Sequence, residues 1–317
     1  MQKKKVFIDG GHGTTGLLII DVLNKHSGVE LISIADEERK NPQAKSSIAS
    51  QADLVILCLP DEAAIEAVKL YQPYQQTKII DASTAHRTSP DWVYGLAELE
   101  HDWRRKIAGA RLIANPGCYP IGMILLLRPL IMNKAIPSSF PVTVFGVSGY
   151  TGGGKNMVEQ YQSMHETGAM EGAFTPYSLT SPHKHLPEIK QFTCLENEPL
   201  FLPSVADADR GMLDIIPMPG KADEYDKIEE ILQSEYANEI FIRFSSSKSS
   251  DAHTGKLSLT ANRGGNFVDL YLFKNNNDLI LTACYDNLGK GAAYNAVQNL
   301  NIAFGFPEHE GIPNAQT

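Results

Sequence analysis

The stretch KVFIDGGHGTTG, residues 5–16, decides the fold that the sequence predicts. Residues 5–9 carry β-branched and aromatic side chains that favour a strand, and the apolar residues 17–24 have helical character. Between them, glycine permits a sharp turn and a close approach to a pyrophosphate, whose charge is stabilised at a helix N-terminus. The stretch therefore predicts the start of a dinucleotide-binding domain, with phosphate contacts from Gly10, Gly13, Thr14, Thr15 and Gly16.

The rest of this N-terminal region alternates strand-like and helix-like segments. Strands are predicted over residues 29–35, 54–59 and 78–81, and residues 61–71 have helical spacing of their apolar side chains. Strands separated by helix-length segments are typical of a parallel sheet covered by helices. The fold class predicted for residues 1–117 is therefore α/β, with a Rossmann-type doubly wound parallel sheet.

The sequence changes in character near Cys118. Residues 121–130 predict a buried helix that ends near Pro129. Strand-like runs separated by long loops rich in glycine and proline then follow, over residues 142–147, 239–244, 267–273 and 279–284. This pattern predicts an α+β second domain over residues 118–288, with a mixed or antiparallel sheet, and residues 289–304 predict a final helix.

The choice between NAD and NADP stays open on the residues alone. Asp36 lies at the end of the second predicted strand, about 20 residues after the last glycine, where an acid often binds a ribose hydroxyl. Arg39 and Lys40 follow closely and suit a 2′-phosphate instead. Near the final helix, Asn287 and Gly291 are candidates to contact the nicotinamide.

Cys118 is the candidate nucleophile. It lies in the tight sequence Asn115-Pro-Gly-Cys-Tyr-Pro120, directly before an apolar helical segment. A cysteine at a helix N-terminus is stabilised as the thiolate, and the thiolate is the form that attacks an acyl carbon. By contrast, Cys58, Cys194 and Cys284 lie inside or beside apolar segments, where cysteine is usually a small core residue.

Further polar residues gather in loops that are suited to catalysis or binding. His183 and His185, with Glu188 after them, can supply a general base and the group that orients it. The segment 81–87 follows a strand end, where α/β sheets place ligands, and a second glycine-rich loop spans residues 148–155. The candidate substrate-binding residues are Ser83, Arg87, Asn115, Tyr150, Lys155 and Glu188.

Composition narrows the function classes. The formal net charge of −9 is spread along the 317 residues, so no basic footprint for nucleic acid is present. No apolar run is long enough for a membrane helix or a signal peptide. The four cysteines are scattered without zinc-like spacing, so we expect no metal and reduced thiols in the cytoplasm.

Taken together, these motifs resemble those of the N-acetyl-gamma-glutamyl-phosphate reductase family, in its shorter form. The resemblance is carried in order by residues 9–16, 81–87, 115–120, 146–155, 183–189 and 286–293. The runs Pro-Gly-Cys-Tyr-Pro and His-x-His-x-Pro-Glu-Ile are its specific parts, whereas the glycine loop is general.

The resemblance implies an activity and a set of roles. It implies NADPH-dependent reduction of an acyl phosphate in arginine biosynthesis, through a thioester on Cys118, with His183 or His185 as the acid–base group. It also implies NADP rather than NAD and a small-molecule substrate. The first domain is completed by the C-terminal helix, residues 289–317, and the second serves substrate binding and oligomerisation, as a homodimer or homotetramer.

Alternatives remain open at this point. An aspartate-semialdehyde dehydrogenase would use the same thioester chemistry, although its nucleophile usually follows asparagine directly, whereas Gly117 precedes Cys118 here. A carrier-linked or aminoadipate-type substrate is a further option within the resembling family. A non-catalytic NADP-binding redox regulator, or a metal hydrolase built on His183 and His185, would place the chain in another functional class.

Overall fold

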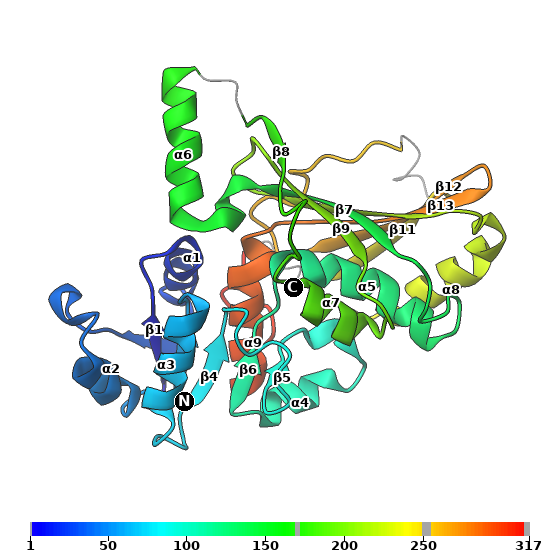
Figure 1. Ribbon diagram of the computed structural model, residues 1–317. Coiled ribbons are helices and arrows are strands. Elements are labelled where there is room, and N and C mark those ends of the chain that lie inside the picture. Colours follow the sequence, from blue (N-terminus) through cyan, green and yellow to red (C-terminus); the bar gives the residue numbers. More distant parts are fainter. Residues whose placement is uncertain (1, 169–171, 249–254, 314–317) are drawn as a thin grey trace. The chain divides into compact units, whose positions relative to one another are not determined.

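The computed structural model describes residues 2–168, 172–248 and 255–313 (Figure 1). Within them the chain forms two compact units. Unit 1 comprises the residues up to Gly117 together with Ala292–Pro313, and unit 2 comprises Cys118–Gly291.

Unit 1 is built on a six-stranded parallel sheet in the order β2-β1-β3-β4-β6-β5. This confirms the predicted α/β class. The strands are β1 (Lys4–Asp9), β2 (Val29–Ile32), β3 (Leu54–Leu57), β4 (Lys78–Asp81), β5 (Val93–Tyr94) and β6 (Leu112–Ala114). The helices of this unit are α1 (Thr14–Leu23), α2 (Pro42–Ala49), α3 (Asp61–Tyr71), α4 (Trp103–Gly109) and α9 (Tyr294–Phe304).

Helix α9 brings the end of the chain back to the sheet of unit 1 through buried side-chain amides. Asn295 and Asn299 both donate from Nδ2 to the Asn115 side-chain oxygen, at 2.9 and 3.2 Å, and to the carbonyl of Gly95. Asn115 in turn donates to the carbonyl of Ala292 at 3.1 Å. All three asparagines are at most 1% exposed, so these hydrogen bonds satisfy groups that water does not reach.

Unit 2 contains a seven-stranded mixed sheet in the order β11-β12-β13-β10-β7-β9-β8. Only the pairs β7·β9 and β11·β12 are parallel. The strands are β7 (Thr143–Gly149), β8 (Phe174–Pro176), β9 (Leu200–Ala206), β10 (Met212–Met218), β11 (Ile242–Ser246), β12 (Val268–Asn275) and β13 (Asp278–Tyr285). The mixed sheet confirms the predicted α+β character of this part of the chain.

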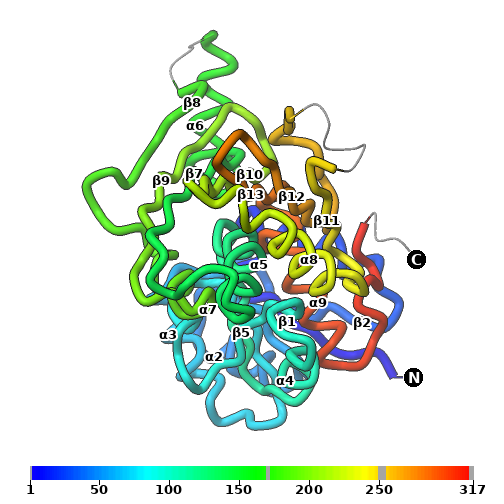
Figure 2. The backbone as a smooth tube through the Cα atoms, turned by 90° about the vertical axis from the view of Figure 1, so that its right-hand side faces the viewer, coloured from blue at the N-terminus to red at the C-terminus, as the bar shows by residue number. Residues whose placement is uncertain are grey.

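Four helices belong to unit 2: α5 (Cys118–Met132), α6 (Gly154–Thr167), α7 (Leu186–Thr193) and α8 (Tyr225–Tyr236). Helices α5, α7 and α8 cover one face of the mixed sheet (Figure 1), and α8 lies beside α5 (Figure 2). No helix in the described part of the chain is long and apolar enough to cross a membrane.

The predicted end of the buried helix near Pro129 is wrong, and so is its predicted start at residue 121. Helix α5 begins at Cys118 and continues through Pro129 to Met132. Proline lacks the N–H that would donate to the carbonyl four residues earlier, which is that of Leu125. The buried hydroxyl of Tyr236 donates to this carbonyl instead, at 2.6 Å. The lost donor is thus replaced from α8.

The sequence also missed several strands and misjudged some boundaries. β9 and β10 lie in the region that was expected to be loops, because Pro203 and Pro217 interrupt their strand pattern. β2 ends at Ile32, three residues before its predicted end at residue 35, and α1 begins at Thr14 instead of residue 17. The final helix opens with a π-helical turn over Gly289–Ala293.

The substitution Tyr236→Phe tests how α5 continues past proline. Removing the hydroxyl leaves the buried Leu125 carbonyl without this donor, so we expect the free energy of unfolding to fall by about 1–3 kcal/mol. The loss should be smaller in a Pro129→Ala background, because alanine restores the N–H that can donate to Leu125. Urea denaturation of the four variants of this cycle measures the coupling. Equal losses in both backgrounds would show that the hydroxyl does not replace the proline donor.

Candidate active site

Cys118 is the first residue of α5, where exposed helix amides and the helix dipole favour thiolate over thiol. Its side of the helix start is crowded. A Cβ on Gly291 would lie 3.1 Å from the Cys118 Cβ, so the glycine leaves room beside the cysteine. This environment differs from that of two other cysteines: burial raises the pKa of both the Cys58 and the Cys284 thiols to about 12. Those two thiols therefore stay protonated near neutral pH.

Aromatic side chains join Cys118 to the histidine pair. The Tyr119 ring lies 5.9 Å from the His183 ring and 6.2 Å from the His185 ring, between centroids. Tyr119 and Tyr177 are hydrogen-bonded, and burial together with the nearby Cys118 charge raises the pKa of Tyr177 to about 12. The structure therefore gathers Cys118, both histidines and two tyrosines within unit 2.

The two histidines have different surroundings. The His185 backbone N–H donates to His183 Nδ1 at 3.2 Å, which leaves that nitrogen unprotonated. His183 Nε2 then carries the proton in the neutral ring, and it lies 3.2 Å from the Tyr177 hydroxyl. Both nitrogens of His183 therefore have partners that hold the ring in place. This arrangement favours His185 as the acid–base group and His183 as its neighbour in a fixed orientation.

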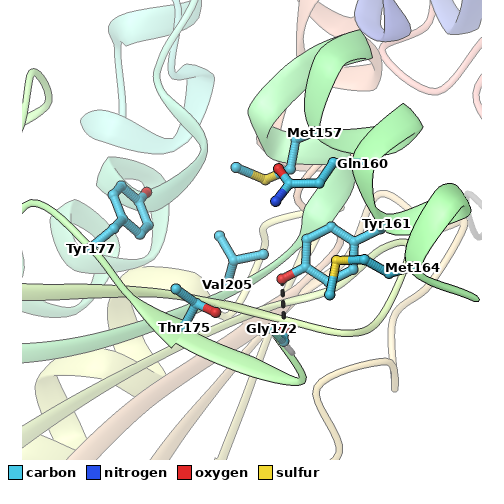
Figure 3. A pocket seen from close by; sticks show the side chains of 8 residues that line it. All are labelled: Met157, Gln160, Tyr161, Met164, Gly172, Thr175, Tyr177 and Val205. Atoms are coloured by element: carbon cyan, nitrogen blue, oxygen red, sulfur yellow. Dashed lines mark hydrogen bonds between the residues drawn. The ribbon is translucent and has the colours of Figure 1, made fainter. Parts of the chain in front are cut away.

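Tyr177 is a site residue that the sequence analysis missed. It also lines a cavity of about 420 Å³ together with residues of α6, β9 and the segment around β8. Figure 3 shows Tyr177 across this cavity from four side chains of α6, namely Met157, Gln160, Tyr161 and Met164. The lone tyrosine in Pro176-Tyr-Ser gave no motif by which its position near Cys118 could be found.

The glycine-rich loop of unit 1 has the geometry that a bound pyrophosphate requires. Gly10 has a φ of +88°, a conformation that favours glycine. A Cβ on Gly16 would lie 2.7 Å from the Gly11 Cα, so only glycine allows helix α1 to approach the loop this closely. Gly13 precedes α1, and Thr14 and Thr15 are its first residues, with their amides at the helix N-terminus. The loop therefore fits the dinucleotide that the sequence predicts.

Asp36 and Arg39 both lie in the exposed turn after β2. The Asp36 carboxylate is 3.2 Å from His12 Nε2, which belongs to the glycine-rich loop. The structure thus brings the loop and the end of β2 together, as expected for a site that holds a nucleotide ribose. Arg39 is exposed at the same turn and is available to an added phosphate.

Three candidate substrate residues are engaged within unit 1. Ser83 donates its hydroxyl to Asp81 at 2.7 Å and accepts from the backbone N–H of Ala85. Arg87 is buried and donates to the carbonyls of Asn115 and Ala82. The side chain of Asn115 is occupied by the buried amides of α9. Each of these polar groups therefore supports the loops in which it lies, and a substrate contact remains a prediction.

Four other candidates lie in unit 2. Tyr150 stacks on Tyr161 with ring centroids 4.7 Å apart, and Lys155 is exposed and paired with Glu159 one turn along α6. Glu188 is buried in the first turn of α7, next to the histidine pair. The side chain of Asn287 donates to Gly149 and Thr151 and accepts from Gly211, so it ties three loops of unit 2 together.

The described part of the chain contains no cluster of side chains that could form a metal centre. No three histidine, cysteine or carboxylate side chains gather there as a candidate cation site. A metal hydrolase built on His183 and His185 would need further ligands.

Comparisons with known proteins agree with this geometry. The model of the semialdehyde dehydrogenase NAD binding domain matches residues 5–107, and that of the semialdehyde dehydrogenase dimerisation domain matches residues 118–287. Among solved structures, aspartate semialdehyde dehydrogenase II from Vibrio cholerae has the same fold, with a TM-score of 0.71 at 15% identity over 96% of this chain and 99% of that one. Fold and site together thus define a protein of the semialdehyde dehydrogenase class.

Relatives of higher sequence identity identify the family within this class. The N-acetyl-gamma-glutamyl-phosphate reductase of Trichormus variabilis is 45% identical over 98% of this chain and 100% of its own length. That of Brucella anthropi is 41% identical over 96% of this chain and 99% of its own length. The chain belongs to the N-acetyl-gamma-glutamyl-phosphate reductase family, which confirms the resemblance carried by its motifs.

Gly16→Ala tests the close approach of α1 to the glycine-rich loop. Because its Cβ would collide with the backbone of Gly11 and Gly10, we expect a loss of about 1–3 kcal/mol in the free energy of unfolding. Gly13→Ala is the matched control, since its Cβ would lie 3.8 Å from the nearest atom in the loop. Thermal and urea unfolding compare the two variants. A larger loss for Gly13→Ala would contradict the packing described here.

Proposed function

We propose that the protein catalyses the NADPH-dependent reduction of N-acetyl-L-glutamyl 5-phosphate to N-acetyl-L-glutamate 5-semialdehyde and phosphate, a step of arginine biosynthesis. The observation that carries the proposal is the position of Cys118 at the start of α5, next to Tyr119, whose ring lies 5.9 and 6.2 Å from the rings of His183 and His185. Membership of the family supplies the substrate.

The first step forms a covalent bond to the enzyme. His185 accepts the Cys118 proton, and the thiolate attacks the acyl carbon. The tetrahedral intermediate expels phosphate, which receives the proton from His185, and a thioester remains on Cys118. The thioester keeps the acyl group activated and attached to the enzyme, while a carboxylate would not accept hydride.

The second step releases the aldehyde. The glycine-rich loop, with Asp36 and Arg39, would hold NADPH, which would supply the hydride that reduces the thioester carbonyl. The reduced adduct collapses to the semialdehyde, Cys118 leaves as the thiolate, and a proton from solvent passes through His185 to restore the thiol. His183 stays fixed beside His185 throughout, because both of its own ring nitrogens have partners and its ring lies 4.7 Å from that of His185 between centroids. For substrate contacts we propose Tyr150, Lys155 and Glu188 in unit 2 and Ser83, Arg87 and Asn115 in unit 1.

For the cofactor site we propose the glycine-rich loop with Asp36 and Arg39. The backbone of Gly10, Gly13 and Gly16 and the first amides of α1 suit the pyrophosphate. Arg39 suits the 2′-phosphate that distinguishes NADP from NAD, because guanidinium binds phosphate through two parallel hydrogen bonds. For the nicotinamide we propose contacts from Asn287 and Gly291, which lie in the segment that follows β13.

We further propose that the protein assembles as a homo-oligomer through the face of the mixed sheet opposite α5, α7 and α8. Five residues lie side by side across five neighbouring strands, each paired in register with the next. In order across the sheet they are Leu202, Phe145, Ile215, Thr282 and Tyr271. Cross-strand neighbours share a face, so these side chains form one apolar row. The match of residues 118–287 to a dimerisation domain supports a second copy of this chain as the partner.

The cytoplasm is the proposed location. Catalysis needs the Cys118 thiol in its reduced form, and all four cysteines are free thiols in the structure. Reduced thiols persist where glutathione and thioredoxin keep them so, which agrees with a metabolic enzyme that uses NADPH.

The reaction is best measured in reverse, with N-acetylglutamate semialdehyde, phosphate and either NADP or NAD. We expect phosphate-dependent formation of reduced nicotinamide, faster with NADP. Cys118→Ser should lower kcat by at least about a thousandfold and leave NADPH affinity unchanged. His185→Asn should lower kcat by about 10²–10⁴-fold, and His183→Asn by less.

The alternatives give different results in the same assay. Turnover of aspartate semialdehyde alone would keep the thioester mechanism and reject the substrate. Absence of turnover with either aldehyde, in a protein that still binds NADPH, would favour the redox regulator.

Phe145→Lys tests the proposed oligomer. Phe145 is 44% exposed in a single chain, so lysine should not disturb its core, whereas burying the charge between two copies should weaken assembly by at least about tenfold. Ile65→Lys, which changes an exposed apolar residue of α3 in unit 1, is the control. Light scattering over a range of concentrations measures the mass. An unchanged mass for Phe145→Lys would rule out this sheet face as the interface.

A further inference from the structure

A buried carboxylic acid and a tyrosine hydroxyl lie directly beneath the start of α5. Asp214 on β10 and Tyr285 on β13 are both fully buried, and the Tyr285 hydroxyl is 2.8 Å from Asp214 Oδ2. The same hydroxyl is 2.6 Å from the carbonyl oxygen of Cys118 and 3.1 Å from the backbone nitrogen of Gly122. None of these contacts is needed for the chemical steps described above.

The position of the hydroxyl within α5 is unusual. In a regular α-helix the N–H of residue 122 would donate to the carbonyl of residue 118. Here the Tyr285 oxygen accepts from that N–H and donates to that carbonyl, so it lies between the two ends of the first helical turn. The helix can come this close to the sheet because residue 122 is glycine: a Cβ there would lie 2.5 Å from Asp214 Oδ2.

Counting protons relates the state of Asp214 to the donor role of Tyr285. A tyrosine hydroxyl has one proton, and a carbonyl oxygen can only accept. Three acceptors surround this proton: the Cys118 carbonyl at 2.6 Å, Asp214 Oδ2 at 2.8 Å and the Tyr119 carbonyl at 3.2 Å, so the contact to Cys118 is the shortest. When the hydroxyl donates to Cys118, its contact with Asp214 needs a proton on the carboxyl group, which then donates to the tyrosine oxygen. Burial also raises the pKa of Asp214 well above its usual range, which agrees with a neutral acid.

We infer that neutral Asp214 and Tyr285 form a positioning pair that holds the first turn of α5 and thereby sets the reactivity of Cys118. Asp214 orients the hydroxyl, and the hydroxyl binds the carbonyl of the reacting cysteine itself. The positive hydrogen of this bond also offsets the negative carbonyl oxygen next to the thiolate. The inference rests on the proposed role of Cys118 as nucleophile, and it assigns these two residues no contact with the substrate.

Tyr285→Phe is the direct test, with Tyr236→Phe as a matched control. Both changes remove one buried tyrosine hydroxyl that donates to a carbonyl of α5, at Cys118 and at Leu125 respectively. We expect Tyr285→Phe to lower kcat by about 10–100-fold with little change in the KM for NADPH. It should also shift the pH profile of Cys118 alkylation by iodoacetamide to higher pH. Tyr236→Phe should lower stability and leave both the profile and kcat unchanged.

A second pair of variants tests the proton on Asp214. Asp214→Asn keeps a donor and the neutral charge, so it should retain the wild-type alkylation profile, whereas Asp214→Leu should resemble Tyr285→Phe. The infrared spectrum of the wild type should contain the carbonyl stretch of a protonated carboxylic acid that is lost in Asp214→Asn. This measurement does not depend on whether the tyrosine variant folds.

The outcomes separate the inference from the proposed function. If wild-type Cys118 is not alkylated faster than the other three cysteines, the nucleophile itself is wrongly assigned. If wild-type Cys118 is reactive but Tyr285→Phe and Tyr236→Phe give the same alkylation profile, the positioning pair is refuted. A lower Cys118 pKa in Asp214→Asn would show that Asp214 is charged and would also overturn the inference.

Discussion

Hydrogen bonds from two tyrosine hydroxyls to the backbone of α5 are the constraint on which the site in unit 2 depends. This helix carries Cys118 at its first residue, yet it contains a glycine at its first turn and a proline near its end. Tyr285 joins the Cys118 carbonyl to the Gly122 amide, and Tyr236 replaces the donor that Pro129 lacks. A buried carbonyl must have a donor, so the surrounding elements complete a helix that its own sequence leaves incomplete.

In unit 1, too, polar side chains form hydrogen bonds that hold the backbone and loops in place. Asn115, a candidate substrate residue, accepts hydrogen bonds from two amides of α9. Ser83 and Arg87 are likewise bonded to their own loops. Polar residues at the carboxyl ends of parallel strands have to fix those loops before any ligand can meet a defined surface. Sequence motifs at such positions therefore report loop structure as much as ligand contact.

The sequence predicted the parts of the molecule that local patterns determine. The glycine spacing in residues 10–16 identified the loop, and the apolar periodicity of residues 61–71 gave α3 with its bounds. Cys118 was found because its motif is compact. Tyr177, Tyr285 and Asp214 could not be found in this way, since they reach the cysteine only through the pairing of strands distant in sequence. The passage of α5 through Pro129 was unpredictable for the same reason, because its replacement donor is 111 residues away.

Unit 1 is discontinuous in sequence, and this determines when it can be completed during synthesis. Its buried helix α9 emerges from the ribosome last, after every strand of its sheet and after the whole of unit 2. Until then the side-chain oxygen of Asn115 and the carbonyl of Gly95 lack their partners from α9. Unit 2, which is continuous from Cys118 to Gly291, can form first. A chain truncated after Gly291 would therefore contain residues 118–291 of unit 2, with Cys118, but would lack the helix α9 that completes unit 1.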